Sequence, residues 1–127
     1  MIDPGAQPST GGEAGFTVKV GEPVDGVTTV TVVGAVDLLT APEVGGAVER
    51  AQQASPAVQV DLRRVEFLGS AGLSVLIDAA RRASDGDGKL AILATNRAVV
   101  RAVEVTGLDA VLRMFDEADR AMEYLRS

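Results

Sequence analysis

The stretch that decides the fold is residues 56–84, which read PAVQVDLRRVEFLGSAGLSVLIDAARRAS. Val58, Val60 and Leu62 alternate with polar residues, which predicts a strand with one apolar face. From about Ser70 to Ser84 the apolar residues recur at helical spacing instead. The expected inward face of this helix is Leu73, Leu76, Ile77 and Ala80. A strand followed by a helix is the repeating unit of an α/β domain.

A helix and a strand also flank this unit on either side. Upstream, Thr40 as N-cap, Pro42 and a capping-box Glu43 mark the start of an amphipathic helix. Its apolar stripe is Val44, Ala47, Val48 and Ala51. Downstream, residues 90–94 form an apolar strand, and Asn96 caps a third helix that ends at Gly107. The chain therefore alternates strands and helices on both sides of residues 56–84.

The two ends of the chain complete the predicted order. Residues 16–20 and 27–33 form strands around a turn, which predicts an opening β-hairpin. Residues 108–115 hold a short edge strand, and Asp116 caps a last helix. The order ββαβαβαβα predicts an α/β fold: one domain, residues 16–127, with a mixed, mostly parallel sheet of four or five strands and about four helices. Residues 1–15, rich in Gly, Pro, Ser and Thr, are expected to be a flexible tail.

The composition narrows the function. The chain has 127 residues, a formal net charge of −6, no histidine and no cysteine. An acidic domain repels phosphate backbones, so we expect no direct nucleic-acid partner. Without histidine the commonest general base is missing, and without cysteine thiolate metal sites are excluded. We expect no cofactor and no metal. Neither a charged-then-apolar leader nor a membrane-length apolar segment is seen, which predicts a cytoplasmic protein without membrane insertion.

Ser70 is the candidate regulatory residue. A strand-to-helix junction presents free backbone N–H groups and the positive end of a helix dipole, so the surroundings of a serine there tolerate an added phosphate. Serine is also a favoured N-cap, and a capping role remains an alternative. Helical spacing places Ser74, Asp78 and Arg81 or Arg82 on one polar stripe with Ser70. This stripe is either an ordinary solvated face or a partner contact.

The segment from Val60 to Leu73 resembles the signature of the STAS domain family, specifically bacterial anti-sigma-factor antagonists. Residues 34–37 (Gly-Ala-Val-Asp) resemble the Gly-x-Leu-Asp step of that family, and residues 106–108 (Thr-Gly-Leu) match near the end of the third helix. The resemblance implies the same α/β fold and places the phosphorylated serine of the family at Ser70. It also implies that Asp37 lies beside Ser70.

The resemblance further implies a partner-switching cycle. The unphosphorylated antagonist binds an anti-sigma factor, which is itself a serine kinase, and so frees a sigma factor. Phosphorylation abolishes this binding, and a PP2C-type phosphatase resets the protein. The candidate partner-binding residues are Asp37, Gly69, Ser70, Ala71, Gly72, Ser74 and Asp78.

Two residues depart from the family pattern. The family often has Asp directly before the phosphorylated serine and Ser or Thr directly after it, where this chain has Gly69 and Ala71. The alternative is therefore a STAS adaptor that is never phosphorylated and serves as a subunit of a signalling or transport complex.

Enzymatic alternatives fit poorly, and we expect a binding module rather than an enzyme. The run from Gly69 to Gly72 resembles a nucleophile elbow, but Leu68 stands where that motif needs glycine, and no histidine can act as base. A receiver-like phosphoacceptor at Asp37 or Asp61 would need a clustered acid pair for magnesium, which the sequence lacks.

Overall fold

The computed structural model describes residues 15–127 and confirms the predicted order of elements. The elements are β1 (Thr17–Val20), β2 (Val27–Val36), α1 (Ala41–Ala54), β3 (Ala57–Leu68), α2 (Ser70–Asp85), β4 (Lys89–Leu93), α3 (Arg97–Val105), the 3₁₀ helix η2 (Leu108–Ala110), β5 (Met114–Phe115) and α4 (Ala118–Arg126).

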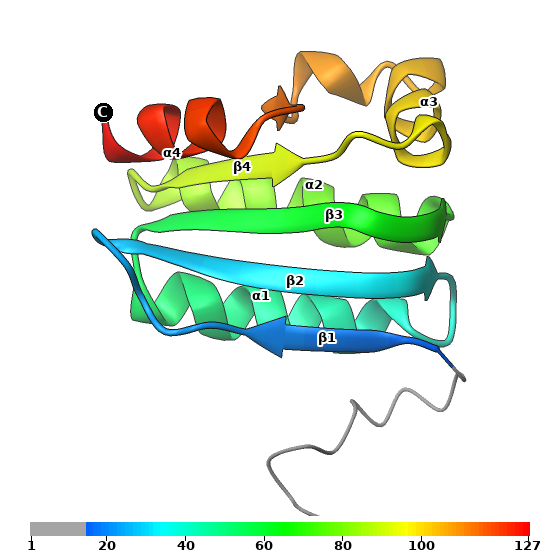
Figure 1. Cartoon of the computed structure of the whole chain (residues 1–127), viewed down its shortest axis with the longest axis horizontal. Helices are drawn as coiled ribbons and strands as arrows, with labels where there is room; N and C mark the ends of the chain where they lie inside the picture. The colour runs from blue at the N-terminus through cyan, green and yellow to red at the C-terminus, as the bar shows by residue number, and fades with distance from the viewer. Residues whose placement is uncertain (1–14) are drawn as a thin grey trace, which may run out of the picture.

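The strands form one sheet in the order β1-β2-β3-β4-β5 (Figure 1). β1 pairs antiparallel with β2, and every other neighbouring pair is parallel. Each parallel step returns the chain through a helix, as a parallel connection requires. The prediction of a mixed, mostly parallel sheet is therefore confirmed.

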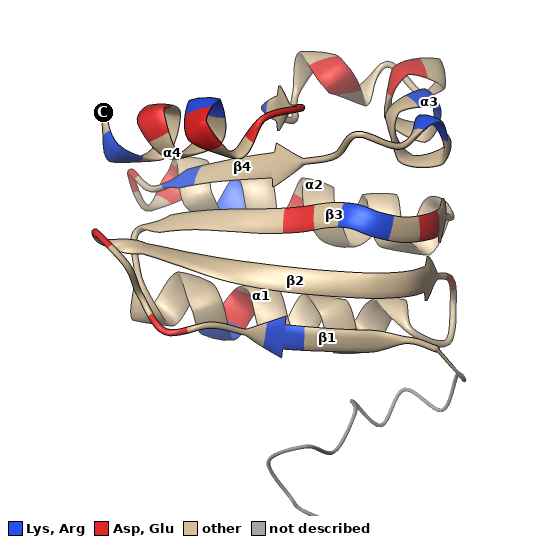
Figure 2. Ribbon diagram, in the orientation of Figure 1, with Lys and Arg blue, Asp and Glu red and all other residues tan. Residues whose placement is uncertain are grey.

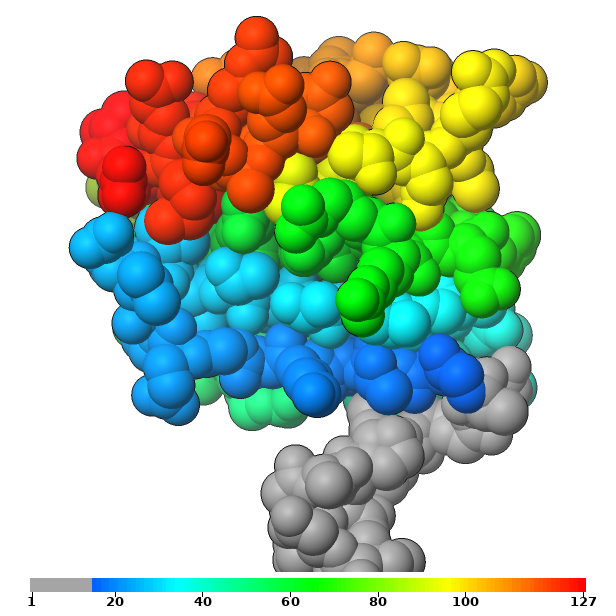
Figure 3. All heavy atoms as spheres, viewed as in Figure 1, coloured from blue at the N-terminus to red at the C-terminus, as the bar shows by residue number. Residues whose placement is uncertain are grey.

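Hydrophobic clusters lie on both faces of the sheet. Along β3, Val58 and Val60 join the cluster beneath α1 and α2, whereas Ala57 joins a smaller cluster with Ala121 and Leu125 of α4. This division follows from the two-residue period of a strand. Figure 1 shows α1 and α2 behind the strands. Figure 3 shows the opposite face, where side chains of β1 to β3 form much of the surface beside α4.

The second and third strands are longer than the sequence indicates. β2 extends to Val36 and β3 to Leu68, rather than ending near residues 33 and 62. Their pairing continues to the end, with register shifts between Thr31 and Val33 and between Gly34 and Ala35. Such irregularities break the alternation of apolar and polar residues, so periodicity alone missed the second half of β3.

The helix ends agree with the sequence in part. The side chain of Asn96 caps α3 by accepting a hydrogen bond from the backbone N–H of Val99 at 3.1 Å, as predicted. Gly107, just beyond α3, has the left-handed φ of 75° expected of a C′ glycine. The prediction that Asp116 caps the last helix is wrong, because Glu117 holds the N-cap position of α4 and makes no side-chain capping bond.

The buried stripes of α1 and α2 differ in how well they were predicted. All four expected residues of α1 are buried. On α2, Ile77 and Ala80 are only partly buried, and the buried set is Gly72, Leu73, Leu76 and Ala79. The apolar face is thus rotated toward the small residues, which let α2 approach the sheet closely.

Fourteen of the fifteen residues of the predicted tail lie outside the described residues. The last one, Gly15, lies against β2. A Cβ atom on Gly34 would come 2.7 Å from the carbonyl oxygen of Gly15, and Gly34 has a φ of +106°. Both facts require glycine at position 34. Among residues 15–127, no helix combines the length and the apolar character needed to cross a membrane.

Candidate functional site

The candidate site lies where β2 and β3 end side by side. Val36 pairs with Leu68, and the backbone N–H of Gly69 donates to the carbonyl of Val36 at 2.9 Å. Asp37 and Gly69 each follow one member of that pair. The structure therefore brings the segment that starts at Asp37 to the same edge of the sheet as the start of α2.

Asp37 forms a tight turn between β2 and α1. Its Oδ1 atom accepts hydrogen bonds from the backbone N–H groups of Leu39 at 3.0 Å and Thr40 at 3.1 Å. The hydroxyl of Thr40 accepts from the N–H of Asp37 at 2.9 Å and donates to the carbonyl of Ala35 at 2.8 Å. The turn projects Leu38 and Leu39 outward, with 80% and 67% of their surfaces exposed.

This turn also corrects the predicted capping box of α1. Thr40 does hold the N-cap position, but its side chain makes no capping hydrogen bond. The residue is buried, and its hydroxyl is used by the end of β2 instead. The predicted reciprocal bond with Glu43 is therefore absent from the described hydrogen bonds of this helix.

Ser70 is the first residue of α2 and is exposed. The N-cap position belongs to Gly69, whose backbone is extended, so the alternative in which Ser70 caps the helix is wrong. The Ser70 hydroxyl makes no hydrogen bond to any other residue of the range 15–127. It stands free at the positive end of the α2 dipole, where an added anion is stabilised.

The other predicted contact residues divide into surface and core. Ser74 and Asp78 are exposed on the same face of α2 as Ser70, and Asp78 lies 3.7 Å from Arg81 in an exposed ion pair. Ala71 and Gly69 are partly buried. Gly72 is buried: a Cβ atom there would lie 2.6 Å from Leu68 Cδ1 and 2.7 Å from Val36 Cγ1. Gly72 therefore packs against the ends of β2 and β3 and is not part of the exposed surface.

Apolar residues beside Ser70 were missed by sequence reasoning. Phe67 and Val105 are 52% and 77% exposed. They line a groove of about 440 Å³ between the start of α2 and α3. The groove is lined by Phe67, Leu68, Ser70, Leu73, Ala98, Arg101, Ala102, Val105 and Thr106. In the sequence, the only signal was a set of large apolar residues outside the predicted core stripes.

Comparison with known proteins now identifies the family. The model of the family described as "Mlab, STAS domain" matches residues 22–114, which is most of the chain. The chain belongs to the STAS domain family. The resemblance inferred from residues 60–73 is thereby confirmed.

Two relatives of this STAS domain are described as anti-sigma factor antagonists. It is 30% identical to the anti-sigma-F factor antagonist RsfB of Mycobacterium tuberculosis, over 80% of this chain and 84% of the relative. The crystal structure of an anti-sigma factor antagonist from Mycobacterium paratuberculosis superposes with a TM-score of 0.81 at 30% identity, covering 95% of this chain and all of that one.

A more distant likeness shows the fold alone. The Bacillus cell fate determinant SpoIIAA, solved in its phosphorylated form, superposes with a TM-score of 0.66 at 14% identity. The match covers 87% of this STAS domain and 100% of that chain.

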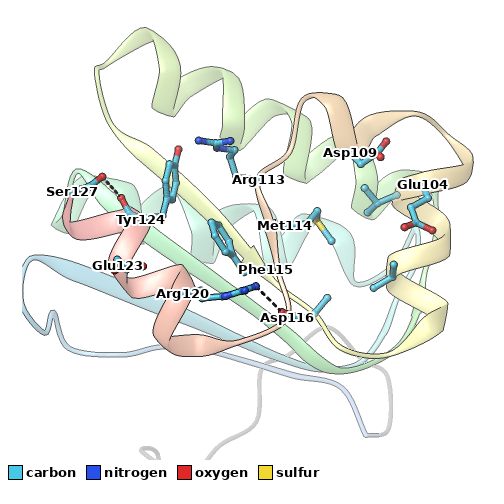
Figure 4. Close-up of a pocket in the computed structure, with 13 residues that line it drawn as sticks. Glu104, Asp109, Arg113, Met114, Phe115, Asp116, Arg120, Glu123, Tyr124 and Ser127 are labelled. Atoms are coloured by element: carbon cyan, nitrogen blue, oxygen red, sulfur yellow. Dashed lines mark hydrogen bonds and ion pairs between the residues drawn. The ribbon is translucent and has the colours of Figure 1, made fainter.

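A larger cavity of this STAS domain, of about 730 Å³, lies at the β5 edge of the sheet and is lined by residues of α3, β5 and α4. Figure 4 shows Arg113, Phe115 and Tyr124 around it. The Arg113 guanidinium lies 4.7 Å from the centre of the Tyr124 ring, and the rings of Phe115 and Tyr124 are 5.5 Å apart. None of the predicted site residues lines this cavity.

Asp61 of this STAS domain is engaged in an ion pair. Arg63 donates from Nε at 3.0 Å, from Nη2 at 2.9 Å and from its backbone N–H at 3.1 Å. Burial by itself would raise the pKa of Asp61, but the hydrogen bonds from Arg63 outweigh it and hold the pKa below the ordinary value of 3.8. Across residues 15–127, no cluster of three or more acidic side chains could hold a metal ion. These facts give Asp61 a structural role.

Proposed function

We propose that this protein is an anti-sigma-factor antagonist that acts in the cytoplasm as a binding module and has no catalytic activity of its own. In its unphosphorylated state it captures an anti-sigma factor with serine kinase activity and thereby releases a sigma factor. The observation that carries the proposal is the free, exposed hydroxyl of Ser70 at the start of α2, beside exposed apolar side chains.

The apolar side chains supply the affinity for the partner. We call Leu38, Leu39, Phe67, Ser70 and Ser74 the switch surface; it lies at the end of the sheet where β2 and β3 stop. Full burial of a leucine side chain is worth about 1.5–3 kcal/mol, so the two leucines together could contribute about 3–6 kcal/mol to a complex. Exposed apolar groups gathered around one polar residue are typical of a protein-binding surface.

Phosphorylation of Ser70 would reverse this binding. The Ser70 Oγ attacks the γ-phosphorus of ATP, ADP leaves, and the hydroxyl proton passes to a base of the kinase. The product adds a charge of about −1.5 to −2 in the middle of the switch surface. Desolvating that charge against an apolar partner is costly, and a loss of about 3–4 kcal/mol lowers the affinity by two to three decades. A PP2C-type phosphatase would remove the phosphate and restore binding.

The experiment combines intact mass and binding. The purified protein is incubated with Mg²⁺, ATP and each candidate kinase anti-sigma factor of the source organism. We expect a gain of one phosphate group that is lost in Ser70→Ala and kept in Ser84→Ala, the matched control at an exposed serine near the other end of α2. The phosphorylated protein should bind the anti-sigma factor at least about 100-fold more weakly. A gain that persists in Ser70→Ala, or equal binding by both forms, would overturn the proposal.

A second candidate function is a constitutive adaptor in a larger signalling or transport assembly. Gly69 and Ala71 favour it, because the acid and hydroxyl residues that often flank the phosphorylated serine of the family are missing here. A pull-down separates the two: recovery of a transporter subunit without an ATPase-type kinase supports the adaptor and contradicts the antagonist.

A further inference from the structure

The position of α3 is fixed by its first turn. The amide of Asn96 donates to the carbonyl of Val65 on β3, while its Oδ1 atom caps the helix. Val99 and Val103 are fully or almost fully buried in the main core. With that face turned inward, the groove beside Ser70 is lined by a neighbouring helical stripe: Ala98, Arg101, Ala102 and Val105. These positions are spaced i, i+3, i+4 and i+7, as one face of a helix requires.

Arg101 and Ser70 both line this groove, Arg101 from α3 and Ser70 from the start of α2. Ser70 and Leu73 line the opposite wall from α2, and Phe67 closes the groove from β3. Arg101 is the sole charged residue among those that line it. Two of the other residues that α3 contributes, Ala98 and Ala102, have small side chains.

The guanidinium of Arg101 is not used by another acidic group. It forms no ion pair within 4.0 Å anywhere in the range 15–127, including with Glu104 in the next turn of α3. Arg97 begins α3, Arg101 lies at its middle and Glu104 near its end, and Figure 2 shows both signs of charge on this helix. Two carboxylates lie near the ends of β2 and β3: Asp37, which has one oxygen bound to the backbone of its own turn, and the exposed Glu66, which forms no ion pair within 4.0 Å with any described residue. An arginine that lines the same groove as an exposed serine and has no carboxylate partner is suited to a phosphate.

We propose that Arg101 binds the phosphate of phosphorylated Ser70, so that the modified side chain folds into the groove between α2 and α3. The inference rests on the proposed phosphorylation of Ser70. The planar guanidinium donates two parallel hydrogen bonds to phosphate oxygens, and the free N–H groups of the first turn of α2 supply further donors.

This site gives the switch a defined off state. In the unmodified protein the groove is an open apolar recess next to Ser70, available to a side chain of the anti-sigma factor. In the phosphorylated protein the recess is filled by an ion pair. The partner then loses a binding pocket in addition to meeting a negative charge, and no element of the fold has to move.

The test uses the full chain with phosphoserine inserted at position 70 during translation, so neither kinase nor partner is needed. The second acid dissociation of the phosphate is followed by ³¹P NMR, since an exposed phosphoserine has a second pKa near 6 and a bound guanidinium lowers it. We expect Arg101→Gln to lower the second acid dissociation constant of the phosphate about three- to tenfold, which means a higher pKa. The constant of the Arg101→Lys variant should lie between those of the Gln variant and the parent protein.

Arg97→Gln is the matched control. Arg97 is exposed, lies one turn earlier on α3 and does not line the groove, so its replacement removes the same charge without emptying the site. The control should leave the phosphate dissociation within about twofold of the parent protein. Far-ultraviolet circular dichroism verifies that each variant is folded.

The outcomes separate this proposal from the function itself. Equal dissociation constants in the parent, the Arg97 variant and the Arg101 variant would overturn the role of Arg101 and leave phosphorylation by a kinase untouched. A clear effect of Arg101→Gln together with no phosphorylation by any candidate kinase would establish the phosphate site and contradict the proposed function.

Discussion

Replacing Gly72 with alanine tests how closely α2 must approach the sheet for Ser70 to be placed as it is. Gly72 lies in the first turn of α2, two residues after Ser70. Its added Cβ atom would lie 2.6 Å from Leu68 Cδ1 and 2.7 Å from Val36 Cγ1, well inside the distance of ordinary contact. Both neighbours belong to the paired ends of β2 and β3, which have little freedom to move away.

Gly46 offers a matched control in α1. A Cβ atom there meets only the Nη1 atom of Arg50, at 3.4 Å, and that is the far end of a flexible side chain. Glycine-to-alanine exchange in a helix gains up to about 1 kcal/mol at either position. At Gly72 this gain is opposed by overpacking, which lowers the free energy of unfolding by roughly 1–3 kcal/mol. We therefore expect the Gly72 variant to be about 1–3 kcal/mol less stable than the Gly46 variant.

Urea unfolding followed by circular dichroism measures both variants against the parent protein. Gly46→Ala should be as stable as the parent or more stable, and Gly72→Ala less stable than Gly46→Ala. The Gly72 variant should also bind the anti-sigma factor more weakly, because lifting the first turn of α2 displaces Ser70 relative to Phe67. If both alanines raise the free energy of unfolding equally, the contact of α2 with the strand ends is looser than the structure shows, and the argument fails.

Two further predictions concern the strand ends and the open face of the sheet. Thr40→Val keeps the shape of the side chain but leaves the N–H of Asp37 and the carbonyl of Ala35 without the Thr40 hydroxyl, so the free energy of unfolding should fall by about 1–3 kcal/mol in a urea titration. A parent-like value would show that water replaces the hydroxyl. Because the folded pKa of Asp61 lies below its ordinary value, this carboxylate stabilises the fold above pH 3.8, and that contribution is lost as the pH falls through the lowered pKa. In Arg63→Gln burial remains without the opposing hydrogen bonds, so NMR titration should show a higher pKa for Asp61; an unchanged pKa would contradict the assigned cause.

The parts of the fold that follow from local pattern were predictable from the sequence. The stripe of α1, the cap at Asn96 and the C′ glycine at position 107 each depend on residues within one or two turns. The parallel sheet then follows from topology, because a helix that connects two neighbouring strands returns the chain to the end of the sheet where the first strand began. The local pattern of each segment was therefore enough to predict the order of strands and helices.

Features that depend on pairing between distant residues were not predictable. The second half of β3 carries the exposed pair Arg63 and Arg64 and lacks regular alternation, and it is a strand because β2 pairs with it as far as Val36. That extension changes the site. It makes Gly69 the N-cap of α2 and leaves the Ser70 hydroxyl free, whereas a strand ending near Leu62 would have put a long loop, residues 63–69, before Ser70.

The switch surface shows why apolar content alone does not identify a binding site. In the sequence, Leu38 and Leu39 are equivalent to core leucines, since both classes are apolar and neighbour predicted elements. Only the hydrogen bonds of Asp37 and Thr40 fix the turn that exposes them. The same turn depends on the buried Thr40 hydroxyl for its link to β2. The exposure of the two leucines is therefore maintained by a polar network at the end of β2, as the proposed partner-binding surface requires.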